Sequence, residues 1–142
     1  MFKHILLPVD LGEESSWKKT VPVAIDQCKS SGAKLSMLTV IPDFGMSIVG
    51  QYFPDNYEKD VAKKILEQLH TFVKQQIPED IRVKHIVGEG SVYEVILNIA
   101  EEIKPDLIIM SSHRPELKDY LLGPNSARVV RHATCSVLVV RE

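Results

Sequence analysis

Short apolar runs alternate with segments of helical periodicity along this chain, and that alternation limits the fold more than any other feature. The runs lie at residues 4–9, 35–41, 81–87, 107–110 and 137–140. Between them, apolar residues recur at helical spacing over 15–31, about 55–76, 91–103 and about 125–133. A chain that alternates strand and helix in this way predicts an α/β domain with a parallel sheet.

The predicted fold is a doubly wound, five-stranded parallel sheet of strand order 3-2-1-4-5 with helices on both faces, Rossmann-like or flavodoxin-like. The first and fourth runs are apolar almost throughout, which is typical of strands buried on both faces. The third run alternates apolar and polar residues, so we expect it at an edge of the sheet. We find no linker or internal repeat, and residues 1–142 are predicted to form one domain.

Two of the predicted helices carry boundary signals. For the segment 15–31, Ser15 and Ser16 are candidate caps, Pro22 removes a backbone donor and kinks or delays the helix, and Gly32 ends it. For the segment 91–103, Ser91 is the candidate cap and Glu94 stands at the third position after it. This spacing predicts a capping box.

Composition excludes some classes of function. The net charge is −2 and the pI about 6.2, which makes nucleic acid a poor partner for the surface as a whole. No run approaches the length of a membrane span, and the amino-terminal run is too short for a secretory signal. Cys28 and Cys135 stand in apolar segments without a CxxC pair, so we expect free thiols in a cytoplasmic protein.

Polar residues follow the first and fourth predicted strands directly. Asp10 comes after the first strand, and Ser111, Ser112, His113 and Arg114 come after the fourth. In the predicted strand order these two strands are neighbours at the switch point, where open α/β sheets bind their ligands. We therefore expect the two segments to face each other across one crevice.

The residue types in this crevice suit a phosphate ester. Gly123, Asn125 and Ser126 lead into a helix whose free N–H groups favour an anion, and Arg114 is a candidate phosphate ligand. Asp10 is a candidate acceptor for a ribose hydroxyl, or a ligand of Mg²⁺ through water. The side chains expected to form an apolar slot for a base are those of Val9, Val40 and Met110.

Other interpretations of the same residues stay open. An aspartate after a strand often only stabilises a turn, and a lone histidine such as His113 is commonly a hydrogen-bonding loop residue. Pro124 removes one N–H from the proposed phosphate cradle, although proline also suits the first turn of a helix.

The segments HILLPVD, TVIP, EGS and IIMSSHRPELKDYLLGPNSARVVRHATCSVLVVR together resemble the universal stress proteins, over essentially the whole chain. The carboxyl-terminal third is the specific part and is similar to the branch that includes bacterial UspF and UspG. That resemblance implies a small cytosolic dimer that binds ATP. In the family's nucleotide motif, G-x2-G-x9-G-S/T, Ser111 and Pro124 stand where glycine and Ser or Thr are usual, and Arg114 stands at the second glycine.

The resemblance also implies a set of site residues and a dimer interface. The nucleotide-binding positions it implies are Pro8, Val9, Asp10, Val40, Met110, Ser111, His113, Arg114, Gly123, Pro124, Asn125 and Ser126. The implied ligand is ATP, with AMP or ADP as alternatives, and Mg²⁺ near Asp10. The strand 136–141 is implied to pair with its copy in a homodimer, and a flat apolar strand at a sheet edge favours such pairing independently.

The sequence is therefore compatible with three functions. The first is a nucleotide-binding sensor in the stress response, and the second is a dimeric interaction module that binds no nucleotide. The third is a weak enzyme that hydrolyses ATP or phosphorylates itself; no nucleophile with a base and an orienting group beside it is evident. Residues 43–54 are predicted to cover the crevice or to form a partner-binding patch.

Overall fold

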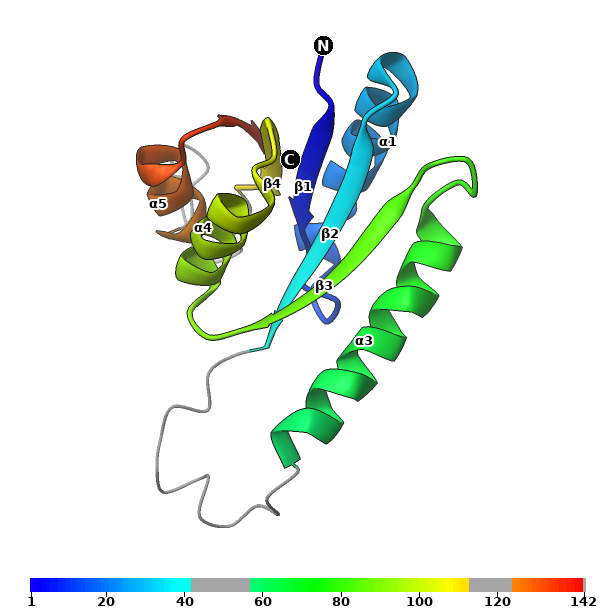
Figure 1. Ribbon diagram of the computed structural model, residues 1–142, viewed down its shortest axis with the longest axis vertical. Coiled ribbons are helices and arrows are strands. Elements are labelled where there is room, and N and C mark those ends of the chain that lie inside the picture. The colour runs from blue at the N-terminus through cyan, green and yellow to red at the C-terminus, as the bar shows by residue number, and fades with distance from the viewer. Residues whose placement is uncertain (42–56, 113–123, 142) are drawn as a thin grey trace.

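The computed structural model describes residues 1–41, 57–112 and 124–141. It contains one five-stranded sheet of order β3-β2-β1-β4-β5 in which all neighbours are parallel (Figure 1). The predicted α/β class and strand order are therefore confirmed. The strands are β1 (His4–Pro8), β2 (Lys34–Ile41), β3 (Val83–Glu89), β4 (Leu107–Ser111) and β5 (Ser136–Val140); the helices are α1 (Thr20–Ser31), α3 (Tyr57–Gln76), α4 (Val92–Ile103) and α5 (Pro124–His132).

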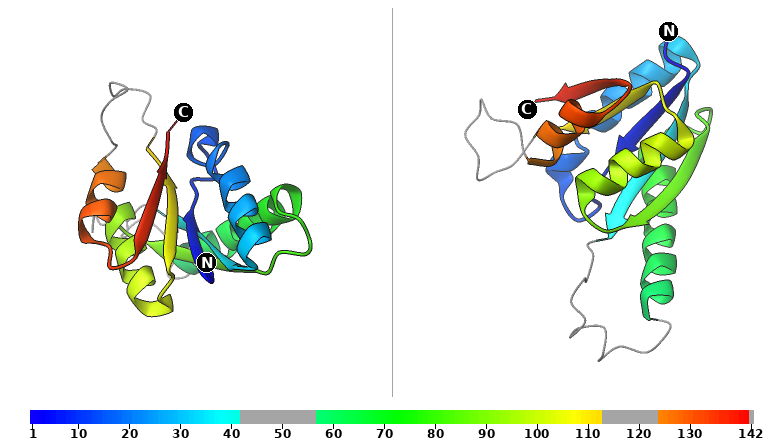
Figure 2. Two further views of the ribbon diagram at one scale, coloured as in Figure 1. Left: turned by 90° about the horizontal axis from the view of Figure 1, so that it is seen from above. Right: turned by 60° about the vertical axis from the view of Figure 1, so that its left-hand side comes forward.

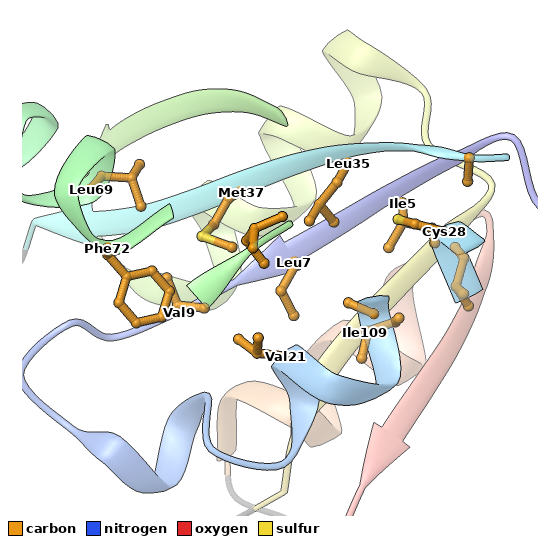
Figure 3. Packing of buried hydrophobic residues seen from close by; sticks show 14 residues of the cluster. Ile5, Leu7, Val9, Val21, Cys28, Leu35, Met37, Leu69, Phe72 and Ile109 are labelled. Carbon is orange, nitrogen blue, oxygen red and sulfur yellow. The ribbon is translucent and has the colours of Figure 1, made fainter. Parts of the chain in front are cut away.

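Helices cover both faces of the sheet, as the sequence predicts (Figure 2). On one face, α1 and α3 pack against alternate residues of β1 and β2; Figure 3 shows Leu7, Met37 and Phe72 in this cluster. On the other face, α4 and α5 pack against the intervening residues, among them Leu6 and Leu38. Because successive strand residues point to opposite faces, one apolar run supplies both cores.

The strands differ in burial according to their place in the sheet. Residues 4–7 of β1 and 107–110 of β4 are buried, whereas β3 is only partly buried and lies at one edge. The edge position predicted for the third strand is thus confirmed, although β3 begins and ends two residues later than the predicted 81–87. The other edge of the sheet is β5, where Leu138 is among the exposed apolar side chains.

The first helix begins later than the predicted residue 15. A short 3-10 turn (Glu14–Ser16) comes first, and α1 starts at Thr20. Pro22 therefore lies in the first turn of α1, where its missing N–H costs nothing because that donor would have no partner within the helix. Gly32 ends α1 with a left-handed φ of 70°, so the predicted stop is confirmed.

The predicted capping box at the start of α4 is wrong. Ser91 occupies the N-cap position, but its side chain makes no capping hydrogen bond. The carboxylate of Glu94 instead accepts a hydrogen bond from the hydroxyl of Tyr93 at 3.0 Å. The backbone N–H of Tyr93, in the first turn, is bonded by Asn125 of α5, so a neighbouring helix supplies the cap.

The described part of the chain can be compared with the predictions for the cysteines and for membrane spans. Cys28, which is buried, and Cys135 are both free cysteines, as predicted. Burial raises the pKa of the Cys28 thiol, which disfavours its reactive thiolate form. Within residues 1–41, 57–112 and 124–141, no helix is both long enough and apolar enough to span a bilayer.

Candidate functional site

The turn after β1 is organised around Asp10. The N–H of Val9 donates to the carbonyl oxygen of Leu38 at 2.8 Å, which holds the end of β1 against β2. One step further, the carboxylate Oδ1 of the exposed Asp10 accepts the N–H of Gly12 at 3.0 Å. This bond forms the local aspartate turn that the sequence offers as the alternative to a ligand role.

Ser16 closes the same turn from the other side. Its hydroxyl accepts the N–H of Asp10 at 2.9 Å and lies 3.0 Å from the carbonyl oxygen of Asp10. Neither Ser16 nor Ser15 therefore caps α1 in the predicted manner. The sequence allows a role for these serines in the Asp10 turn, because short hydroxyl side chains a few residues after an aspartate are typical of such turns.

The end of β4 is tied to the Asp10 turn and to α5. The hydroxyl of Ser111 donates to the backbone oxygen of Ser15 at 3.3 Å. The hydroxyl of Ser126, which is 3% exposed, donates to the backbone oxygen of Ser111 at 2.7 Å. Segments separated by about a hundred residues in sequence therefore meet at one edge of the sheet, where β1 and β4 end.

The amino end of α5 holds Pro124 and Asn125. Pro124 is the first residue of the helix, where it sacrifices no intrahelical hydrogen bond. The side-chain oxygen of Asn125 accepts the N–H of Tyr93 at 3.2 Å, which leaves its amide nitrogen as the donor for any other group. The guanidinium of Arg128 lies 4.5 Å from the centre of the Tyr93 ring and adds a second contact between α5 and α4.

The apolar residues predicted to contact the base differ in their exposure to solvent. Val9 and Met110 are 4% and 5% exposed, and they belong to the cores on opposite faces of the sheet. Val40 is only partly buried, near the end of β2. Pro8 is also partly buried, at the end of β1. Of these four predicted residues, Val40 and Pro8 are therefore the more accessible to a ligand.

Several predicted residues lie outside the described part of the chain. They are His113, Arg114 and Gly123, together with the segment 43–54 that was predicted to cover the crevice. For Mg²⁺, the relevant observation is that Oδ2 of Asp10 accepts no hydrogen bond from any described residue, so one carboxylate oxygen remains for a hydrated cation. Among the described residues no three His, Cys, Asp or Glu side chains gather as a metal site.

The strand order and the polar turns beyond β1 and β4 define a doubly wound α/β domain with its polar edge at the switch point. Comparison of the sequence with known families gives the same class a name. Residues 1–141 match the model of the Universal stress protein family, and the chain belongs to that family.

Individual relatives cover the chain from end to end. Universal stress protein G of Shigella flexneri is 32% identical over 143 residues, which is 99% of this chain and 100% of that relative. Universal stress protein YxiE of Bacillus subtilis is 29% identical over 150 residues, covering 99% of this chain and all of the relative. The predicted family membership is therefore confirmed.

Solved structures show the same fold. Hypothetical protein MJ0577 aligns with a TM-score of 0.74 at 28% identity, covering 100% of this chain and 97% of that one. A universal stress protein in complex with cAMP aligns with a TM-score of 0.68 at 23% identity, covering 99% and 97%. A family member from Arabidopsis thaliana with AMP bound aligns with a TM-score of 0.62 at 16% identity, covering 99% and 92%.

Proposed function

We propose that this universal stress protein binds an adenine nucleotide at the carboxyl edge of its sheet, between the Asp10 turn and the amino end of α5. The single observation that supports this most is the set of hydrogen bonds from Ser111 to Ser15 and from Ser126 to Ser111. They bring an acidic turn and a helix amino end to one edge. An acidic group for the ribose or metal and N–H donors for phosphate are the two needs of a nucleotide.

Each described residue has a role in this proposal. Asp10 accepts a ribose hydroxyl or holds Mg²⁺ through water with its Oδ2, while Pro8 and Val40 contact the base. At α5 the free N–H groups of the first turn and the amide nitrogen of Asn125 meet phosphate oxygens. Ser126 supports this end of the site by holding α5 against β4, because its hydroxyl already donates to Ser111.

The known ligands of two relatives fit this assignment. One structural relative is in complex with cAMP and another has AMP bound, so the ligands of this fold include adenine nucleotides. For this chain we propose ATP, with AMP or ADP as alternatives. Because Pro124 contributes no N–H donor, a triphosphate gains fewer backbone contacts here than at a helix that begins with Ser or Thr.

Calorimetric titration of nucleotide-stripped protein with ATP, with and without Mg²⁺, tests the proposal. Asp10→Asn keeps the oxygen that accepts the Gly12 N–H but removes the charge, so we expect weaker binding, a smaller effect of Mg²⁺ and unchanged stability. Asp26→Ala, an exposed aspartate within α1, is the matched control and should bind like the parent. Absence of binding at millimolar ATP would leave the interaction module as the better description.

We further propose that the protein is a cytoplasmic homodimer joined through β5. Ser112 donates its N–H to the backbone oxygen of Val140 at 3.2 Å, so the backbone groups of Val140 face β4. Because these groups alternate along a strand, those of Val139 face outward from the edge and suit an antiparallel copy. We thus propose a stress-response regulator that binds a nucleotide at the carboxyl edge of its sheet and dimerises through β5.

The dimer has its own test. Val139→Pro removes one outward N–H and leaves the ladder between β4 and β5 intact, so light scattering should find a monomer that still binds ATP. Val139→Thr keeps the N–H and the β-branched shape and should remain dimeric. A Val139→Pro protein that stays dimeric would place the interface elsewhere.

A further inference from the structure

A cleft lies at the amino ends of the strands, at the opposite end of the sheet from the proposed nucleotide site. It has a volume of about 480 Å³, and we call it the basal cleft. It opens where β2 and β3 begin, beside the last turn of α4. Its walls are formed by His4, Lys34, Leu35, Ser36, Arg82, Val83, Lys84, Glu102 and Ile103.

The strand register explains why the cations of this cleft lie together. Ser36 of β2 is the partner of Lys84 of β3, and the N–H of Leu35 donates to the carbonyl oxygen of Arg82 at 3.0 Å. Lys34 and Ser36 share one face of the sheet because they are two residues apart, and Lys84 lies beside them on that face. This is the face that α4 covers further along the strands.

The described side chains that line the basal cleft carry more positive than negative charge. Lys34, Arg82 and Lys84 are exposed, and none of them forms an ion pair with a described residue. Glu102 is the one carboxylate among the lining side chains. Like charges on adjacent strands repel one another, and this repulsion does not favour pairing of the strands.

A buried polar pair forms part of the wall. His4 is 9% exposed, and its Nε2 lies 2.7 Å from the hydroxyl oxygen of Ser36, which is 1% exposed. Burial lowers the pKa of His4, and the positive charges of Lys34 and then Lys84 act in the same direction, against the charge of Asp106. The two lysines are therefore close enough to oppose a proton on the imidazole, and a bound anion would reduce that effect.

We propose that the basal cleft binds a small phosphate-bearing anion. Its volume lies in the range of small-molecule sites, and an arginine with two lysines is the donor set that phosphate oxygens favour. Lys84, Glu102 and Ile103 also line an adjoining, mostly apolar cleft of about 450 Å³ along β3. An organic phosphate has room there for its carbon skeleton, whereas inorganic phosphate or pyrophosphate uses the basal cleft alone.

The probes for this site are pyrophosphate and phenyl phosphate, added to the full-length protein in phosphate-free buffer at low salt. Calorimetry measures the affinity, and NMR follows the imidazole signal of His4. We expect saturable binding of at least one probe with a rise in the pKa of His4. Arg82→Gln and Lys84→Gln should each weaken binding by roughly tenfold, the scale of one charge-assisted hydrogen bond. Tighter binding of phenyl phosphate identifies an organic ligand, and equal binding identifies an inorganic one.

Matched controls separate this site from the nucleotide site and from general surface charge. Lys29→Gln removes an exposed lysine of α1 and should leave probe affinity unchanged. Asp10→Asn should also leave it unchanged, so failure of one proposal does not carry over to the other. The basal cleft proposal is overturned by three results: no saturable binding, equal weakening by Lys29→Gln and Arg82→Gln, or displacement of the probe by a glutamate-rich peptide that binds more tightly.

Discussion

Removal of the Ser126 hydroxyl tests whether this group stabilises the fold or binds the ligand at the proposed nucleotide site. The sequence analysis places Ser126 among the predicted nucleotide-binding residues, whereas in the structure its hydroxyl donates to the backbone oxygen of Ser111 at 2.7 Å. Replacement of Ser126 by alanine removes that bond and the contact it makes between α5 and β4. If the structural role is right, the loss appears in the ligand-free protein.

The size of the effect follows from burial. Ser126 is 3% exposed, so water cannot replace the lost donor, and the change removes a short hydrogen bond from a packed position. Loss of such a bond costs about 1–2 kcal/mol of unfolding free energy. For a chain of this size that corresponds to a fall in Tm of about 3–6 °C.

Urea unfolding and thermal melting of ligand-free Ser126→Ala measure this cost. The matched control is Ser30→Ala, because the hydroxyl of Ser30 donates to the carbonyl oxygen of Gln27 at 3.3 Å on an exposed surface. We expect the control to change stability by less than about 0.5 kcal/mol. ATP titration of both variants then gives the effect on affinity at a temperature where each is folded.

One combination of stability and affinity would contradict a structural role for the Ser126 hydroxyl. If ligand-free Ser126→Ala melts like the parent but binds ATP much more weakly, the hydroxyl serves the ligand and the bond to Ser111 is not maintained in solution. A loss of stability with a smaller loss of affinity supports the structural role.

Two further predictions concern other parts of the fold. A Cβ added at Gly88 would lie 2.4 Å from Cγ1 of Val95, so Gly88→Ala should cost about 1–3 kcal/mol by urea unfolding, and Val95→Ala in the same chain should recover part of that loss. Burial lowers the pKa of His85, and the ring of His70, stacked at 3.8 Å, lowers it further. As the pH falls, the imidazole of His85 is protonated in the unfolded chain before it is protonated in the folded protein. The contribution of His85 to stability is therefore fully present above pH 6.5 and is lost as the pH drops below it. Urea unfolding at pH 7.5 and 5.5 should show a smaller fall for His85→Gln than for the parent, and His132→Gln, an exposed control, should behave like the parent.

The sheet could be predicted from the sequence because its signal is repeated in every strand. Continuous apolar character marked β1 and β4 as central, and alternation marked β3 as an edge; the burial pattern follows both. The start of α1 could not be placed, because residues 15–19 carry both cap-forming serines and helix-compatible side chains. Hydrogen bonds from the Asp10 turn, which depend on the tertiary fold, decide between the two.

Dependence on the tertiary fold also explains why the sequence could not predict the hydrogen bonds of the serines in the proposed site. A hydroxyl near a strand end can donate to a ligand or to a backbone oxygen that folding brings close, and both uses leave the same residue in the sequence. For Ser111 and Ser126 the backbone acceptors come from segments 96 and 15 residues away, so no local pattern reveals them. Among the described residues, the groups left for a ligand are Oδ2 of Asp10, the amide nitrogen of Asn125 and the first N–H groups of α5. A nucleotide bound here would therefore depend more on the backbone and on one carboxylate than on the hydroxyls of Ser111 and Ser126.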